Sequence, residues 1–155
     1  MTEESIMSLA RVAVEINEVM DEMQQASALP PPRVFISYAR EDLAIARQLA
    51  AWLEANGFAA WWDCHIEAGA AFDERIERAI DEAFAVIAVW SDRSVRSDWV
   101  KWEALQASKR GKLVPVAVDV LDLADIRPPF NGLSTLRLSD EVRIIEELRR
   151  LHAAR

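Results

Sequence analysis

The chain has 155 residues, the length of one ordinary domain, and 52% of them are hydrophobic, which is enough for a single buried core. Its formal net charge is −8, so it lacks the excess of cations that a general nucleic-acid binder uses against phosphates. A single cysteine, Cys64, and two histidines exclude an intramolecular disulfide and a histidine metal site. Without a secretory signal or an apolar run of membrane-spanning length, the sequence predicts a cytoplasmic protein with no membrane partner.

Residues 1–28 contain the first predicted helix, which covers 5–26. Apolar side chains recur in it at alternating spacings of three and four, the heptad-like pattern of a helix that packs along another helix: Ile6, Leu9, Ala13, Ile16, Met20 and Met23. Three consecutive prolines within residues 29–32 end the helix and form a spacer. The helix either lies on the surface of its own domain or binds another chain. The spacer favours the second interpretation, an oligomerisation or partner segment.

Beyond the spacer, residues 33–155 alternate between apolar runs of strand length and helical patterns. The predicted strands are 33–38, 58–63, 84–90, 112–120 and 133–138. The predicted helices are 41–56, 73–83, 98–111 and 140–154. Strands that read as continuous apolar runs and alternate with helices belong to a parallel sheet that is buried on both faces. The sequence therefore predicts a flavodoxin-like, doubly wound α/β fold with a five-stranded parallel sheet in the order 2-1-3-4-5, plus the additional N-terminal helix.

The predicted fold places a ligand site beyond the carboxyl ends of the strands, between the first and third strands, where the strand order reverses. Three segments reach that crevice: 38–42, 63–72 and 91–103. In the last of them, Trp99 and Glu103 are four residues apart and share one face of the predicted helix. Trp102 is turned away from Glu103 by about a quarter of the circumference. We therefore predict that Trp99 and Glu103 form a site and that Trp102 packs against another surface.

The charge of Glu103 can also be predicted from its position. It lies near the start of its helix, which Ser97 or Asp98 can cap. The positive end of the helix dipole favours an ionised carboxylate there, so the sequence predicts a charged Glu103. The ordinary alternative is a solvated glutamate that pairs with Lys101 or Arg96.

Several familiar sites are missing from the sequence. No G-x-G-x-x-G motif follows a strand and the chain has only four glycines, so it contains no classical dinucleotide fingerprint and no phosphate-binding loop. The strand ends lack the acidic residues of a phospho-receiver, and neither His65 nor His152 belongs to a credible catalytic triad. Trp99 and Glu103 remain the candidates for chemistry.

Five segments of the chain are VFISYARED, LAAWLEANGFAAWWD, IEAGAAFDERIERAI, AVIAVWSDRSVRSDWVKWEALQA and KLVPVAVD. In order and spacing they resemble the Toll/interleukin-1 receptor (TIR) domain, with the closest likeness to bacterial TIR proteins and to the NAD-cleaving TIR domain of animal axon degeneration. The resemblance covers residues 33 to about 152. It implies the fold predicted above and an enzyme that cleaves the nicotinamide–ribose bond of NAD+, giving nicotinamide and ADP-ribose or a cyclic isomer.

The resemblance also implies partners. NAD+ is the substrate, and neither a further cofactor nor a metal is expected. Other TIR domains are expected to assemble with this one on activation, as a homo-oligomer or filament, with a sensor or activator as a further partner. Such a protein would be an immune effector in bacterial defence. The family also contains a second class, a non-catalytic TIR–TIR signalling scaffold or a mimic of a host's TIR signalling.

Individual residues receive roles from the same resemblance. The W-x-x-x-E pattern of catalytic members runs here from Trp99 to Glu103, which makes Glu103 the expected catalytic residue, stabilising an oxocarbenium-like ribose. The implied substrate-binding residues are Trp99, Phe35, Tyr38, Ala39 and Arg40, where the aromatic rings form walls and Arg40 meets the diphosphate. The BB loop, which gates the pocket and contacts a neighbouring subunit in the family, corresponds to Asp63, Ile66, Glu67 and Gly69.

Overall fold

The computed structural model of the protein describes residues 2–62 and 70–155. The chain forms two compact units that divide between Pro31 and Pro32. The first unit contains α1 (Glu3–Ala28), which is capped by Thr2 because the Thr2 side chain accepts a hydrogen bond from the Ser5 amide. The large apolar side chains of the predicted seam are all exposed: Ile6, Leu9, Ile16, Met20 and Met23. Within its own unit, α1 therefore leaves this seam uncovered.

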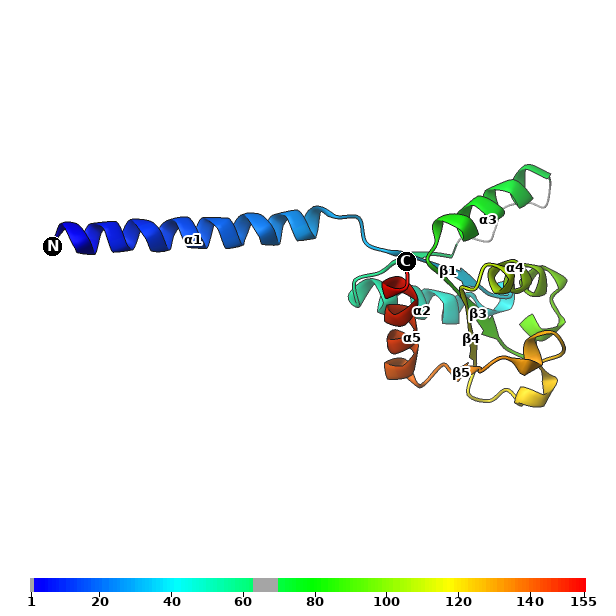
Figure 1. Cartoon of the computed structure of the whole chain (residues 1–155). Coiled ribbons are helices and arrows are strands. Elements are labelled where there is room, and N and C mark those ends of the chain that lie inside the picture. Colours follow the sequence, from blue (N-terminus) through cyan, green and yellow to red (C-terminus); the bar gives the residue numbers. More distant parts are fainter. Residues whose placement is uncertain (1, 63–69) are drawn as a thin grey trace. The chain divides into compact units, whose positions relative to one another are not determined.

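The second unit is built on a parallel sheet. Its strands are β1 (Arg33–Ser37), β2 (Ala59–Trp61), β3 (Ala85–Trp90), β4 (Leu113–Ala117) and β5 (Leu136–Arg137), in the order β2-β1-β3-β4-β5. Figure 1 labels four of these strands, β1, β3, β4 and β5. The helices are α2 (Leu43–Ala55), α3 (Ala70–Glu82), α4 (Asp98–Lys109) and α5 (Glu141–Ala153). This strand order confirms the predicted flavodoxin-like fold. In the described part of the chain, no helix is long and apolar enough to cross a membrane.

The helices cover both faces of the sheet, as the continuous apolar strands require. On one face, Val34 and Ile36 of β1 pack with Leu49 of α2 and Ile144 of α5. On the other face, Phe35 of β1 packs with side chains of α3 and α4, among them Ile76, Ile80 and Ala107. Neighbouring residues of β1 thus serve opposite layers, because successive strand side chains alternate between faces.

The end of α2 follows directly from the sequence. Its buried residues recur at helical spacing: Ala46, Leu49, Ala50 and Leu53. Gly57 then takes a positive φ of 90°, which glycine adopts without steric cost. The Phe58 amide returns to the Leu53 carbonyl at 3.0 Å, so one of the last carbonyls of the helix is satisfied. This turn delivers the chain into β2.

β5 is shorter than the predicted strand 133–138, and a proline explains the difference. The Lys112 carbonyl accepts from Val86 and the Val118 amide donates to Trp90, so alternate residues of β4 bond to β3. The residues between them face β5, since the Ala117 carbonyl accepts from the Leu138 amide. Pro115 belongs to this second set and has no N–H to offer, so the ladder towards β5 cannot continue past it.

A buried lysine holds the C-terminal end of α3. Lys112, just before β4, is only 7% exposed. Its Nζ donates hydrogen bonds to the carbonyls of Ile80 at 2.7 Å, Asp81 at 3.2 Å and Ala83 at 2.7 Å. These carbonyls lie at the end of a helix, where backbone acceptors are left over and the dipole favours a cation. All three ammonium hydrogens of Lys112 therefore have partners.

Candidate functional site

The loops after β1 and β3 are tied together at the carboxyl edge of the sheet. Asp42, after β1, accepts a hydrogen bond from the hydroxyl of Ser91, which follows β3. Ser94 is fully buried, and its hydroxyl donates to the Val89 carbonyl at 2.6 Å and accepts from the Ser91 amide at 2.7 Å. Two of the three segments that the sequence assigned to the crevice are therefore held together beside the start of α4.

Glu103 projects from α4 into the protein interior. Ser97 caps α4, because its hydroxyl accepts a hydrogen bond from the Val100 amide at 3.2 Å. The side chain of Glu103 is fully buried, and its Oε1 accepts a hydrogen bond from the Ser37 hydroxyl at the end of β1, at 3.2 Å. Its Oε2 is also buried and has no hydrogen-bond partner among the described residues. A buried oxygen without a partner is rare in folded proteins, so this carboxyl is held in an energetically unfavourable state.

The solvated alternative for Glu103 is wrong. Lys101, its suggested partner, pairs with Asp98 at 3.4 Å between Nζ and Oδ1. No ion pair joins Glu103 to a cation anywhere in residues 2–62 and 70–155. Its carboxyl is therefore separated both from solvent and from any described compensating charge.

The predicted ionisation of Glu103 is wrong as well. Burial raises the pKa of this carboxyl from the ordinary value of 4.5 to about 8, and the hydrogen bond from Ser37 lowers it only in part. Desolvation outweighs the helix dipole because the dipole contributes at most about 2 kcal/mol, whereas burial shifts a carboxyl by several pH units. In this structure Glu103 is therefore protonated at neutral pH.

Trp99 and Trp102 lie together, which corrects the prediction that they serve separate surfaces. Their rings stack with centroids 5.2 Å apart and an angle of 20° between the planes. Both are half-buried and pack on the cluster formed by Phe35, Ile76 and Ile80. The spacing of three residues is a neighbouring spacing on a helix just as four is. Trp102 and Trp99 thus form one aromatic surface on the layer that contains Glu103.

Trp61 is a residue that the sequence reasoning missed. Its ring stacks on Phe35 at 5.0 Å with an angle of 22°, on the same face of the sheet. The sequence contained a signal for this contact. Side chains alternate between the two faces along β1 and β2, so paired residues such as Phe35 and Trp61 lie side by side on the same face.

The remaining predicted site residues fall into three groups. Phe35 and Tyr38 are buried in clusters on opposite faces of the sheet, so the structure does not bring their rings together. Ala39 is buried and Arg40 is exposed at the start of a short 3-10 helix, Arg40–Asp42. The BB-loop residues Asp63, Ile66, Glu67 and Gly69 lie outside the described residues.

A family model for the TIR domain matches residues 34–152. The chain belongs to the TIR domain family. Its W-x-x-x-E pattern is the segment of α4 that carries Trp99 and the buried Glu103. A comparison with curated proteins gave no match.

Solved TIR structures resemble this TIR domain over about three quarters of the chain. A TIR-STING receptor from C. gigas, solved with 2',3'-cGAMP, is 28% identical with a TM-score of 0.60, and the match covers 76% of this chain and 38% of that chain. The TIR domain of the Toll-related receptor TRR-2 from Hydra magnipapillata is 23% identical with a TM-score of 0.58, covering 78% of this chain and 95% of that one.

A third similar structure is an assembly. The TIR domains of the activated Roq1 resistosome, which recognises the pathogen effector XopQ, are 21% identical to this chain with a TM-score of 0.52. The match covers 77% of this chain and 80% of that one. At this identity the likeness supports the fold, and the fold agrees with the sheet order observed here.

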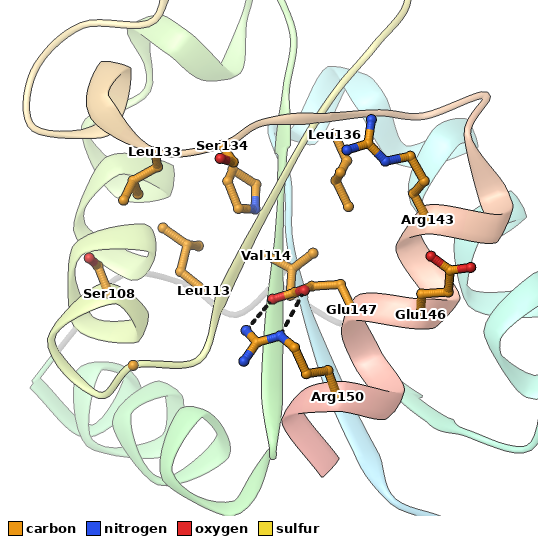
Figure 2. Close-up of a pocket in the computed structure, with 12 residues that line it drawn as sticks. Ser108, Leu113, Val114, Leu133, Ser134, Leu136, Arg143, Glu146, Glu147 and Arg150 are labelled. Carbon is orange, nitrogen blue, oxygen red and sulfur yellow. Dashed lines mark hydrogen bonds and ion pairs between the residues drawn. The ribbon is translucent and has the colours of Figure 1, made fainter. Parts of the chain in front are cut away.

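The TIR domain also has a groove of about 650 Å³ beside the part of β4 that does not pair with β5. It opens where Pro115 stops β5, and Leu133 and Ser134 line it on one side (Figure 2). On the other side, Arg150 of α5 forms an ion pair with Glu147 close to Val114 (Figure 2). The Arg150 guanidinium lowers the pKa of the Glu147 carboxyl. Among the predicted site residues that the structure describes, none lines this groove.

Metal ligands were not expected. In the described parts of the TIR domain and α1, no group of three or more His, Cys, Asp or Glu side chains lies close enough to hold a metal ion.

Proposed function

We propose that this TIR domain is an NAD+ glycohydrolase with Glu103 as its catalytic residue. The observation that supports the proposal is the buried carboxyl of Glu103, whose Oε2 has no partner among the described residues. It lies beside β1 on the side of the sheet where open α/β folds bind ligands. A protein that keeps such a group at a ligand crevice gives up stability for a function in binding or catalysis.

The reaction has a simple balance. The bond between the ribose C1′ and the nicotinamide nitrogen breaks, and its electron pair neutralises the positive nicotinamide ring. The ribose becomes oxocarbenium-like until water, or a nucleophile of the same molecule, adds to C1′ and loses a proton. The ionised carboxylate of Glu103 stabilises the positive charge that develops on the ribose, and a low-dielectric site strengthens this attraction.

Protonation of Glu103 then sets the pH dependence. Its pKa of about 8 means that most molecules carry a neutral carboxyl at pH 7. A bound cationic nicotinamide ring favours the ionised form, since an opposite charge nearby lowers a carboxyl pKa. We expect the rate at low substrate concentration to rise with pH until Glu103 of the free enzyme is ionised.

The aromatic surface and the exposed arginine have supporting roles in this proposal. The stacked Trp99 and Trp102 form a flat wall that can position a planar ring and limit access of water. Arg40 is exposed at the edge of the β1 loop and can pair with the diphosphate of NAD+. NAD+ is the substrate and no further cofactor takes part, and the reaction is assigned to the cytoplasm, in bacterial defence.

Assembly is the second part of the proposal. Residues 1–28 act as a self-association segment that raises the local concentration of TIR domains. The exposed apolar seam supports this role, and the charged residues beyond the first turn of α1 lie outside the seam: Arg11, Glu15, Glu18, Asp21 and Glu22. Because an isolated helix is marginal in water, a covered seam would also stabilise α1.

The enzyme proposal is tested by nicotinamide release. Concentrated protein, with and without a crowding agent, is incubated with NAD+ and compared with Glu103→Ala and with the control Glu54→Gln, which changes an exposed glutamate of α2. Loss of Glu103 should lower release by at least about 100-fold, the usual effect of losing an electrostatic stabiliser. If assembled wild-type protein releases no more nicotinamide than Glu103→Ala, the enzyme proposal fails, and the scaffold class remains.

The assembly proposal has a matched pair of variants. Ile16 lies on the seam and Val14 lies off it, yet both are similarly exposed at 54% and 55%. Ile16→Glu should lower the light-scattering mass of the full chain, as should deletion of residues 1–28, whereas Val14→Glu should not. Circular dichroism checks that the α/β unit stays folded. Equal masses for the Ile16 and Val14 variants would remove the role given to the seam.

A further inference from the structure

The geometry around Glu103 assigns a task to Ser37. We propose that Ser37 is a positioning residue that holds Oε1 of Glu103 and leaves Oε2 as the single carboxyl oxygen that contacts the substrate. This inference rests on the proposed function, which makes Glu103 the catalytic residue. It adds a second residue and a specific division of labour between the two oxygens.

Ser37 is well suited to hold another group because its own position is fixed. It is the last residue of β1, is fully buried and pairs with Ala88 of β3. β1 is an interior strand between β2 and β3; it pairs with β2 as far as Phe35 and with β3 up to Ser37. A hydroxyl on an interior strand is a more rigid anchor than one on a loop, which is the arrangement that a preorganised site needs.

The two oxygens of Glu103 have different surroundings. Oε1 accepts the Ser37 hydroxyl at 3.2 Å, whereas the buried Oε2 has no partner among the described residues. A hydroxyl bound to Oε1 restricts the rotation of the carboxyl and uses one acceptor site of that oxygen, so Oε2, whose acceptor sites have no described partner, is the oxygen better placed for the substrate. The substrate group that fits Oε2 is then one hydroxyl of the ribose or the cationic C1′ centre, met by one oxygen.

Other charges do not compete with Ser37 for control of Glu103. The two causes that shift its pKa are burial, which raises it, and the Ser37 hydrogen bond, which lowers it. Two charged side chains near Glu103 in sequence or on the β1 loop have other described partners: Lys101 pairs with Asp98 on α4, and Asp42 accepts from Ser91. Removal of the Ser37 hydroxyl therefore acts on the ionised form of Glu103 directly, because a carboxylate gains more from a donor than a neutral carboxyl does.

The test measures Glu103 itself, by carbon-13 NMR of side-chain carboxyls over a pH titration, with the Glu103 signal identified by its loss in Glu103→Gln. Ser37→Ala should raise the pKa of Glu103 by about one pH unit, the effect of one hydrogen bond to a charged group. Ser37→Thr keeps the hydroxyl and should keep the wild-type titration. Ser108→Ala removes an exposed hydroxyl near the end of α4 and should also leave the titration unchanged.

Ser37→Cys has a side chain of similar size but a weaker hydrogen-bond donor, so it should raise the pKa of Glu103 by less than Ser37→Ala does. It replaces Ser37→Ala in the test if that variant does not fold. Nicotinamide release is the second readout. At pH 7 it should fall about tenfold in Ser37→Ala and approach the wild-type rate at high pH, because a rise of one pH unit lowers the ionised fraction tenfold.

The two readouts separate the two proposals. An unchanged Glu103 titration in both Ser37→Ala and Ser37→Cys overturns the role of Ser37, whatever the activity. If the Glu103 titration shifts in the Ser37 variants while the wild-type protein releases no nicotinamide, the contact between Ser37 and Glu103 is supported and the enzyme proposal fails. A titration that shifts equally in Ser108→Ala would show a general loosening of the domain and would also overturn the inference.

Discussion

Glu103 and Lys112 are two buried ionisable side chains near opposite ends of the same sheet, and they differ in how fully their polar atoms are hydrogen-bonded. Lys112 lies before β4 and donates to three carbonyls at the end of α3. Glu103 lies beside the carboxyl end of β1 and has one described partner, the Ser37 hydroxyl. Burial raises the pKa of Glu103 and lowers the pKa of Lys112, so each is disfavoured in its charged form.

This difference in hydrogen bonding distinguishes Lys112, which has a structural role, from Glu103, for which we propose a functional one. The carbonyls around Lys112 need a donor and Lys112 needs acceptors, so both sides of the interaction gain from it. At Glu103 the described surroundings satisfy one oxygen only, and the unfavourable burial of the other is not repaid within the described residues. We take this asymmetry as the reason to look for a ligand at Glu103 and for none at Lys112.

The largest expected effect is on the pH dependence of stability. Glu103→Gln removes a carboxyl whose pKa rises on folding to about 8, so between pH 4.5 and 8 the folded wild type holds a proton that the unfolded chain has lost. Wild-type stability should therefore fall as pH rises through this window, by about 1.4 kcal/mol for each pH unit and on the order of 4 kcal/mol in all. The variant lacks this slope and should be the more stable protein at pH 8. Urea unfolding of the wild type and the variant at several pH values across this range measures the slope of stability with pH and the stability at pH 8.

Glu147→Gln is the control for that experiment. Arg150 lowers the pKa of Glu147, so the contribution of this pair is lost as pH falls and not as it rises. This variant should keep the wild-type slope between about pH 5 and pH 8. A Glu103→Gln protein with the same slope as wild type would contradict the protonated state of Glu103 in the folded protein.

Lys112→Met should give the next largest effect, a loss of stability. Methionine fills a similar volume but leaves three buried carbonyls without a donor, at roughly 1 kcal/mol each and about 3 kcal/mol together. Lys109→Met changes an exposed lysine of α4 and should stay within about 0.5 kcal/mol of wild type. Urea midpoints at pH 7 compare the two. A loss no larger than that of the control would mean that Lys112 is as dispensable as a surface lysine.

The fold was predictable because its signals are redundant. The alternation of strands and helices and the fully apolar β3 each indicate the same parallel sheet. The length of β5 was not predicted, because the apolar pattern of 133–138 is a property of that segment alone. What shortens it is Pro115 on the neighbouring strand, and the consequence depends on which side of β4 that missing N–H faces.

The position of the candidate site could be predicted from the sequence, whereas the burial and the protonation state of Glu103 could not. Helix geometry and strand order placed Glu103 at the carboxyl edge, next to Trp99. Its burial, its bond to Ser37 and its raised pKa depend on side chains far away in sequence, since Ser37 is 66 residues earlier. A dipole argument that considers one helix therefore predicted an ionised group, and the desolvation supplied by the other elements reversed the result.

The smallest expected effect concerns Trp99 and Trp102. Because the rings stack at 5.2 Å, a double-mutant cycle with leucine at both positions should give a coupling of about 1 kcal/mol in unfolding free energy. Trp52 packs with the cluster on the other face of the sheet, so the cycle of Trp102 with Trp52 should give less than about 0.5 kcal/mol. If the coupling between Trp99 and Trp102 were no larger than that of the control pair, the two tryptophans would contribute to stability independently. That result would contradict a single aromatic surface. A coupled pair would instead mean that changing Trp102 also disturbs the wall next to Glu103, so that nicotinamide release should fall in both single variants.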